Sequence, residues 1–325
     1  MAAGVSVGIV GAGSIAGDHI RAWQGLGASV LLHSPRTGRR VADGYGIRYC
    51  ASLVELLAAV DMVVVCAPTD THFALASAAV EAGRPVLCEK PLTRWPAQAR
   101  ALLHAAAAAG VPVVPAHVVR FFPAYQVLAD AVGAGTVGSV QAVRLSRVGP
   151  APSSGWFTDV ARSGGLMDLM VHDLDVARWL AGEVVGVVAA QHPATVDGRL
   201  PDVVSAQVSL THANGALSQL HGRWGPPGSA FRTAVEVWGT AGSLRSDNGP
   251  EHRVVAESGG RSVLLPVADD GDAFRAQAAD FLALVRGGTA SRVTGADGLA
   301  AVVLMDAVLG SIDNGLPVTV AVDQR

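Results

Sequence analysis

The sequence predicts an α/β protein of two domains: a doubly wound parallel sheet, followed by an α+β domain built on a mostly antiparallel open sheet. Three observations predict it. Short apolar strands alternate with helices over the first third of the chain, a glycine-rich turn joins the first strand to the first helix, and later strands follow one another directly. Alternation is typical of parallel sheets, whereas consecutive strands favour antiparallel pairing. We place the domains at residues 1–117 and 118–325.

The first domain shows strand and helix signals in regular alternation. Glycines at 83 and 110 mark helix ends, and Pro96 suits a first helical turn. Ser52 and Glu55 form a capping box that predicts a further helix start. Strands are expected at residues 5–10, 29–32, 47–49, 62–66, 85–88 and 113–114, and helices at 14–26, 71–82 and 96–109.

The pattern changes after about residue 116, where helices no longer separate the strands. The tract at residues 149–155 is rich in Gly, Pro and Ser and is expected to be a loop. Strands are expected at residues 140–148, 184–190, 203–210, 216–224, 231–238 and 263–267, and helices at 122–132, 166–180, 272–285 and 295–313.

Composition excludes several classes of protein. Of 325 residues, 50% are hydrophobic and 16% charged, and the net charge is −3. This balance favours a large core and no nucleic-acid or membrane partner. Three cysteines (Cys50, Cys66 and Cys88) are too few for a disulfide framework and are expected as free thiols. The N-terminus lacks a basic leader region and no apolar run is long enough for a membrane span, so we expect a cytoplasmic protein.

The glycine-rich turn points to a dinucleotide. Gly11, Gly13 and Ala16 have the G-x-G-x-x-A spacing, directly after a strand and at the start of a helix. The first glycine permits the tight turn, and the second lets the backbone approach a pyrophosphate. The helix N-terminus, at Ser14 and Ile15, would offer free N–H groups to the phosphates. The alternative is a plain tight turn.

The end of the second strand favours NADP over NAD. NAD-binding proteins usually carry an acid there for the ribose hydroxyls, but this chain has His33 and Ser34, followed by Arg36. An arginine can pair with a 2′-phosphate that an acid would repel. The alternative is that these arginines belong to a solvated loop.

Glu89, Lys90 and Pro91 directly follow an apolar strand. Proline removes a backbone donor and restricts the residue before it, so Lys90 is more constrained than a loop lysine. Lys90 is therefore either a solvated side chain or a placed reagent. Because strand ends of open parallel sheets bind ligands, we favour the second interpretation.

The helix at residues 163–180 carries a narrow polar stripe of Asp168, His172, Asp175 and Trp179 on an otherwise apolar surface. A carboxylate one turn from a histidine can orient the ring, which prepares a general base. The alternative is a core histidine with its partner. Asp173 does not fit the stripe. No metal is expected, because no further ligand lies nearby in the sequence.

Together these motifs resemble the glucose-fructose oxidoreductase and inositol dehydrogenase family of NAD(P)-dependent oxidoreductases. The resemblance implies an N-terminal Rossmann domain and a C-terminal domain whose open sheet serves as an oligomer interface, hence a homodimer or homotetramer. It covers nearly the whole chain, and its blocks are residues 8–16, 66–92, 118–125, 135–140, 156–182 and 235–244.

The resemblance also implies roles for individual residues. Lys90 matches the catalytic lysine, and Asp168 and His172 match the Asp-x-x-x-His motif. A cis peptide bond is implied before Pro91. The acid after the second strand is missing, and residues 117–119 lack the asparagine that many members have before the Arg-Phe pair. Cofactor contacts are implied for Thr69, His72 and Glu89.

The function expected is hydride transfer between NAD(P) and a secondary alcohol or ketone of a sugar, cyclitol or related polyol. Lys90 would hydrogen-bond the reacting oxygen, His172 would exchange its proton, and Asp168 would orient His172 or bind a neighbouring hydroxyl. Two alternatives stay open: a non-catalytic NAD(P) sensor or regulatory protein, and NAD-dependent redox-neutral cleavage of glycosides. Candidate substrate groups are Arg120, Trp156 and Asp159.

Overall fold

The computed structural model describes residues 4–249, 253–268, 271–288 and 291–321. They form two compact units, Met1–Phe121 with Asp272–Val302 and Phe122–Gly271 with Val303–Arg325. Residues 272–302, assigned to the second domain from the sequence, therefore belong to the first unit. The reason is packing: a helix of this segment lies against the first helix of the chain.

The first unit contains a six-stranded sheet in which all the strand pairs are parallel. Its strands are β1 (Ser6–Val10), β2 (Ser29–His33), β3 (Arg48–Tyr49), β4 (Met62–Val65), β5 (Val86–Glu89) and β6 (Val113–Ala116). They lie in the order β3-β2-β1-β4-β5-β6, with the crossover beside β1. The predicted parallel, doubly wound sheet is confirmed.

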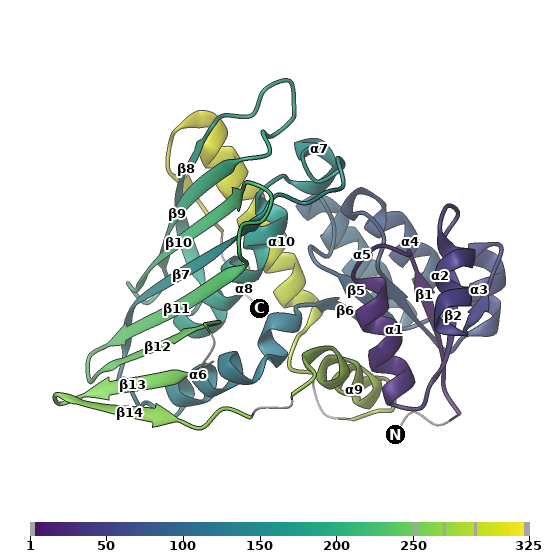
Figure 1. The fold of residues 1–325 in the computed structure, drawn as a ribbon, viewed down its shortest axis with the longest axis horizontal. Coiled ribbons are helices and arrows are strands. Elements are labelled where there is room, and N and C mark those ends of the chain that lie inside the picture. Colours follow the sequence, from purple (N-terminus) through teal and green to yellow (C-terminus); the bar gives the residue numbers. More distant parts are fainter. Residues whose placement is uncertain (1–3, 250–252, 269–270, 289–290, 322–325) are drawn as a thin grey trace. The chain divides into compact units, whose positions relative to one another are not determined.

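Helices cover both faces of this sheet (Figure 1). They are α1 (Ala16–Gly25), α2 (Gly38–Tyr45), α3 (Leu53–Ala59), α4 (Thr69–Glu81), α5 (Pro96–Ala109), the 3-10 helix η1 (Val118–Phe121), α9 (Ala273–Val285) and the start of α10 (Gly295–Asn314). One apolar cluster joins Ile9 to Trp23 of α1 and Phe281 of α9. A second joins Val63 to Leu56 of α3. Since both faces are covered, the strands read as unbroken apolar runs.

The second unit contains a nine-stranded open sheet. Its strands are β7 (Val140–Pro150), β8 (Val184–His192), β9 (Val204–His212), β10 (Leu217–Gly225), β11 (Arg232–Gly239), β12 (Ser243–Asp247), β13 (Val254–Ser258), β14 (Arg261–Leu265) and β15 (Val318–Thr319). They lie in the order β14-β13-β12-β11-β7-β10-β9-β8-β15. The pair β7–β10 is parallel and the other pairs are antiparallel, which confirms the mostly antiparallel sheet.

Helices of the second unit cover one face of its sheet (Figure 1). The covering helices are α6 (Pro123–Gly133), α8 (Met167–Ala181) and the later part of α10, and the short helix α7 (Val160–Ser163) follows β7 in the sequence. Helix α8 packs on β7 and β10. Strand β9 shows the consequence, because Ala206 and Val208 are buried whereas the next residue after each, Gln207 and Ser209, is exposed. Such alternation is typical of a sheet with one covered and one open face.

By length and composition alone, α10 could cross a membrane, and it is the single such helix among the described residues. A core helix of a soluble protein passes the same test. Val302, Met305 and Val308 on α10 are fully buried within the two units. Packing in the core therefore accounts for part of its apolar character.

A buried ion pair holds α8 on the sheet and explains the aspartate that did not fit the predicted stripe. Arg147 of β7 donates from Nε and Nη2 to Asp173 Oδ1, at 3.1 and 2.9 Å. Both side chains are at most 6% exposed. Burial alone lowers the pKa of Arg147, but the Asp173 charge and hydrogen bonds outweigh it and raise that pKa, so the guanidinium stays charged.

Replacing Asp173 by alanine is expected to destabilise the protein by about 3–5 kcal/mol, because it leaves the Arg147 charge buried and unpaired. Chemical denaturation followed by circular dichroism measures the change. The matched control is Glu257→Ala, which breaks the exposed Arg245–Glu257 pair on the same sheet and should cost less than about 1 kcal/mol. Equal losses in the two variants would contradict this role of the buried pair.

Candidate active site

The turn between β1 and α1 is shaped as dinucleotide binding requires. Gly11 has φ +106°, and a Cβ there would lie 2.5 Å from the Cys66 carbonyl oxygen, so only glycine fits. A Cβ at Gly13 would meet nothing within 4 Å. Gly11 thus allows the tight turn, and Gly13 leaves open space beside the backbone. These are the two properties that let a pyrophosphate approach the chain.

Helix α1 begins beside this turn without a side-chain cap. Ile15 is its N-cap residue and makes no side-chain cap hydrogen bond. Ser14, just before it, is exposed, and Ala16, just after it, is fully buried. The first N–H groups of a helix lack intrahelical partners, so this end can receive an anion. The residues present therefore fit the phosphates of NAD(P).

The segment after β2 carries the predicted determinants of cofactor preference. Ser34 is half-buried and Arg36 is exposed. Among the described residues, no ion pair engages Arg36. Arg39 instead stacks over the Tyr49 ring at 4.8 Å. Of these side chains, Arg36 is thus the one left available to a 2′-phosphate, and its role stays a prediction.

Strand β5 ends in the Glu89-Lys90-Pro91 turn. The Lys90–Pro91 peptide is cis, as the resemblance implied. Glu89 is buried, and its Oε2 accepts a hydrogen bond from the Lys90 backbone N–H at 3.1 Å. Lys90 itself is half-buried. The turn is therefore held by a carboxylate from inside the unit while the lysine side chain retains access to solvent.

Helix α4 holds the same turn from another side. His72 is buried, with Nδ1 2.8 Å from the Pro91 carbonyl oxygen and Nε2 2.8 Å from the Ala67 carbonyl oxygen. A neutral ring can donate to only one of these oxygens. Thr69, the first residue of α4, is also buried. The contacts of His72 make it a brace between two strand ends, and the predicted cofactor contacts of Thr69 and His72 stay predictions.

Lys90 is chemically singular in this chain. Of the 24 Lys and Arg residues, it is the only lysine. The chain therefore uses arginine wherever a surface cation suffices, and keeps an ammonium group at one strand end. The sequence alone contains this information, but it lies in the separate counts of lysine and arginine and not in any local motif. The single lysine favours the interpretation that Lys90 is a positioned reactive group over the alternative that it is a solvated surface side chain.

Helix α8, in the second unit, carries the predicted acid–base residues. Asp168 and His172 lie one turn apart on this helix. Asp168 is buried and His172 half-buried. Asp175 is buried and Trp179 half-buried, so the stripe is more enclosed than a solvated helix face. Lys90 belongs to the first unit and this pair to the second.

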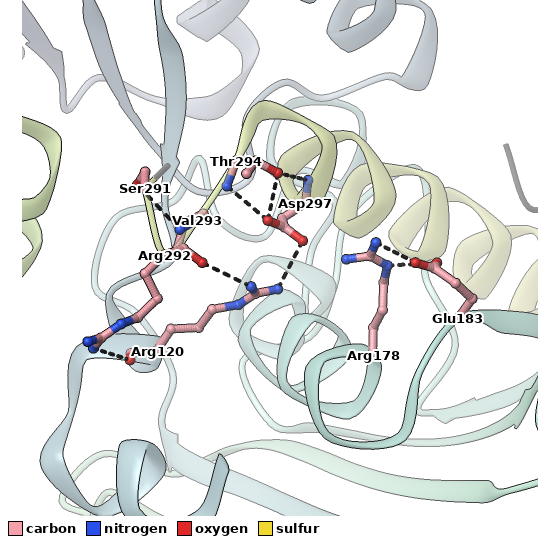
Figure 2. A network of polar contacts seen from close by, with 8 residues as sticks. All are labelled: Arg120, Arg178, Glu183, Ser291, Arg292, Val293, Thr294 and Asp297. Carbon is pink, nitrogen blue, oxygen red and sulfur yellow. Dashed lines mark hydrogen bonds and ion pairs between the residues drawn. The ribbon is translucent and has the colours of Figure 1, made fainter. Parts of the chain in front are cut away.

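Arg120, a predicted substrate residue, lies in a network of the first unit (Figure 2). Its Nη2 is 3.3 Å from Asp297 Oδ1, and its side chain is 5% exposed. Asp297 also accepts from the Thr294 N–H and hydroxyl. In return, the Arg292 guanidinium donates to the Arg120 carbonyl oxygen. Arg120 thus ties η1 to the start of α10, and its substrate role stays a prediction.

The two other substrate candidates lie around α7. Asp159 is the N-cap residue of α7, and its carboxylate accepts from the Ala161 and Arg162 N–H groups. Trp156 stacks on Phe157 with ring centroids 3.9 Å apart. These contacts give both residues a local structural role. Their substrate roles also stay predictions.

The cysteines are free, as expected, and all three are buried. Burial, with the nearby Glu89 charge, raises the pKa of Cys66 and Cys88 well above the usual range. These thiols therefore stay protonated and are poor nucleophiles at neutral pH. In the part of the chain that the structure describes, no cluster of three His, Cys, Asp or Glu residues could hold a metal ion.

Comparison with known proteins matches both units. The family model described as "Oxidoreductase family, NAD-binding Rossmann fold" matches residues 5–117, and the "GFO/IDH/MocA C-terminal domain" matches residues 125–245. The chain belongs to the glucose-fructose oxidoreductase and inositol dehydrogenase family. It is an NAD(P)-dependent oxidoreductase that acts on CH–OH groups.

Individual relatives match over nearly their full length. The myo-inositol dehydrogenase Hyg17 of Streptomyces leeuwenhoekii is 34% identical, over 90% of this chain and 91% of that protein. Inositol 2-dehydrogenase of Rhizobium meliloti is 28% identical, over 98% and 99%. The solved structure of UDP-N-acetylglucosamine 3-dehydrogenase GnnA from Acidithiobacillus ferrooxidans has a TM-score of 0.82 at 26% identity and covers 95% of this chain and 98% of that one.

The two glycines of the turn are expected to respond differently to alanine. Gly13→Ala should leave the stability of the cofactor-free protein unchanged, because its Cβ meets no atom, but should weaken dinucleotide binding by crowding the pyrophosphate. Gly11→Ala should lower thermal stability, because of its positive φ and the contact with Cys66. Thermal melts and NAD(P) titrations of both variants test this. Undiminished dinucleotide affinity in Gly13→Ala would contradict the assignment.

Proposed function

We propose that this protein transfers a hydride between NAD(P) and a secondary alcohol, or the matching ketone, of a sugar, cyclitol or related polyol. The observation that carries the proposal is its single lysine, positioned at the end of β5 by the buried Glu89 carboxylate. The glycine turn after β1 lies at the same carboxyl edge of the sheet. Relatives named as inositol dehydrogenases support the polyol class.

The chemistry divides between the cofactor and three side chains. When bound, the nicotinamide supplies the hydride acceptor or donor. Lys90 donates a hydrogen bond to the reacting oxygen and stabilises the negative charge that develops there. His172 takes the hydroxyl proton during oxidation and returns it during reduction, and Asp168 orients His172 or binds a neighbouring hydroxyl.

Lys90→Met and His172→Ala are each expected to lower kcat by about 10²–10⁴-fold while the Kd for NAD(P) changes little, because each removes a group that acts on the reacting oxygen. The measurement is reduced-nicotinamide absorbance with a panel that includes myo-inositol, other cyclitols, sugars and amino sugars. Cofactor binding is followed separately by titration.

Intact turnover in both variants, with unchanged cofactor binding, would contradict this assignment. Cofactor binding by the wild-type protein without hydride transfer across the panel would instead favour a non-catalytic sensor. A dinucleotide that co-purifies and never exchanges with free cofactor would favour redox-neutral glycoside cleavage.

We also propose that the protein prefers NADP. The end of β2 carries no acid, and Arg36 is exposed and unpaired among the described side chains. A guanidinium forms charge-assisted hydrogen bonds with a phosphate, whereas the hydroxyls of NAD offer it no charge. Ser34 is a second candidate partner for the phosphate.

Arg36→Ala is expected to weaken NADP binding about tenfold or more and to leave NAD binding nearly unchanged, since a hydrogen bond to a charged group contributes about 1.5–3 kcal/mol. Isothermal titration of the cofactor-free protein with both dinucleotides measures this. Arg39→Ala is the matched control, because Arg39 stacks on Tyr49 and should not alter the ratio. Tighter binding of NAD by the wild-type protein would refute the preference.

Two further properties belong to the proposal. We expect a cytoplasmic protein, and a homodimer or homotetramer that forms through the open face of the nine-stranded sheet. On that face Leu217 of β10 and Trp238 of β11 both align with Ala142 of β7. They are 55% and 40% exposed, which is high for large apolar side chains. Burial of this row against a second copy would remove apolar surface from water.

A further inference from the structure

A buried histidine of α1 reaches the carboxylate that holds the Glu-Lys-Pro turn. His19 is fully buried, and its Nε2 lies 2.8 Å from Glu89 Oε1. The other carboxylate oxygen, Oε2, accepts from the Lys90 backbone N–H at 3.1 Å. One carboxylate therefore links the helix that follows the glycine turn to the backbone of the only lysine.

The geometry of this link assigns the hydrogen on the imidazole. An ionised carboxylate only accepts, so Nε2 must carry the hydrogen that it shares with Glu89. His19 Nδ1 has no hydrogen-bond partner among the described residues. The ring also packs edge-on against Phe274 of α9, with centroids 5.2 Å apart and planes at 86°. The imidazole is thus fixed by packing, and within the described part of the chain its one polar contact is with Glu89.

The electrostatics agree with an ionised, oriented Glu89. Burial alone raises its pKa. The hydrogen bond and charge of His19, with the charge and N–H of Lys90, outweigh burial and lower that pKa below the usual value. A buried charge is tolerated when hydrogen bonds satisfy it, so removing either donor is expected to disturb the carboxylate.

We propose that His19 is a positioning residue for Lys90: by holding Glu89 Oε1, it orients the carboxylate whose Oε2 fixes the Lys90 backbone and so aims the amine. The proposal rests on the catalytic role proposed for Lys90. It gives Glu89 a task besides the cofactor contact implied by the family resemblance, because each of its oxygens accepts a hydrogen bond within the protein.

Such positioning matters because a lysine side chain is long and flexible. Four rotatable bonds separate its backbone from the ammonium group, so a small rotation at the backbone is amplified at the nitrogen. A misplacement of about 1 Å at a reacting centre can lower the rate about 10²-fold. A hydrogen bond from α1 thus affects catalysis without any contact with the substrate.

The first experiment compares His19→Leu with His19→Gln, using the panel substrate with the highest turnover, myo-inositol being the first probe. His19→Leu removes the donor and is expected to lower kcat about tenfold to a hundredfold, with substrate KM and dinucleotide Kd within about twofold. His19→Gln places an amide N–H near the former Nε2 position and should recover most of the loss. A loss that glutamine does not rescue would overturn the proposal.

The matched control is Trp23→Phe, which alters a buried side chain one turn further along α1. Trp23 is fully buried, and its Nε1 has no hydrogen-bond partner among the described residues. This variant perturbs α1 packing without touching Glu89, so kcat should stay at the wild-type value. A fall in kcat equal to that of His19→Leu would show a general packing effect and refute the specific role.

A double-mutant cycle separates this inference from the proposed function. In a Lys90→Met background, His19→Leu should cause no further loss of kcat, because the group it aims is gone. A further loss of equal size would show that His19 acts independently of Lys90. If Lys90→Met itself retains full turnover, the proposed function fails. The effect of His19 on Lys90 is then tested by a measurement that does not depend on enzyme activity.

The single lysine provides that independent measurement. Reductive methylation with ¹³C-formaldehyde labels Lys90 and the α-amine alone, because the chain has no other lysine. In the cofactor-free protein, His19→Leu should move the Lys90 resonance, whereas His19→Gln and Trp23→Phe should leave it near the wild-type position. A Lys90 signal unchanged in His19→Leu would overturn the inference even if the proposed function holds.

Discussion

Parallel pairing of β1, β4 and β5 is the constraint on which the functional edge of the first unit depends. The register aligns Val10 with Val65 and Val65 with Cys88, so the three strands end level with one another. The glycine turn and the Glu-Lys-Pro turn therefore leave the sheet at one edge, where open α/β sheets bind ligands. Because successive side chains of a strand alternate in direction, a one-residue slip of β5 would exchange the directions of Glu89 and Lys90.

Two buried carboxylates each join segments that are far apart in sequence. Glu89 joins β5 to α1 through His19, and Asp173 joins α8 to β7 through Arg147. In each link the carboxylate accepts hydrogen bonds on both of its oxygens, which limits the penalty of burying the charge. Both also hold the elements that carry proposed catalytic side chains. The hydrogen bonds that make a buried carboxylate tolerable thus also fix the orientation of the elements that it joins.

Local sequence patterns were sufficient to predict the helices and strands, but they did not predict which of these elements contact one another. The apolar runs and capping signals located β1, β4, β5 and α8 closely, because such patterns depend on neighbours within one or two turns. The contact of His19 with Glu89 spans 70 positions and depends on the sheet order, which no local pattern contains. The return of residues 272–302 to the first unit was missed for the same reason. The singular lysine was a different case, since it is visible in composition once lysine and arginine are counted apart.

The presence of a lysine and not an arginine at position 90 also has a chemical reason. Arginine is always charged, and its planar fork suits carboxylates and phosphates, which explains its use elsewhere in the chain. A lysine ammonium is compact, carries three donors and can change its pKa when partly buried. A developing alkoxide is a single oxygen atom, so a point charge matches it better than a fork does. Hydride transfer at a CH–OH group would require such a lysine at this strand end. Its backbone N–H is held by the Glu89 carboxylate, and that carboxylate is held in turn by His19.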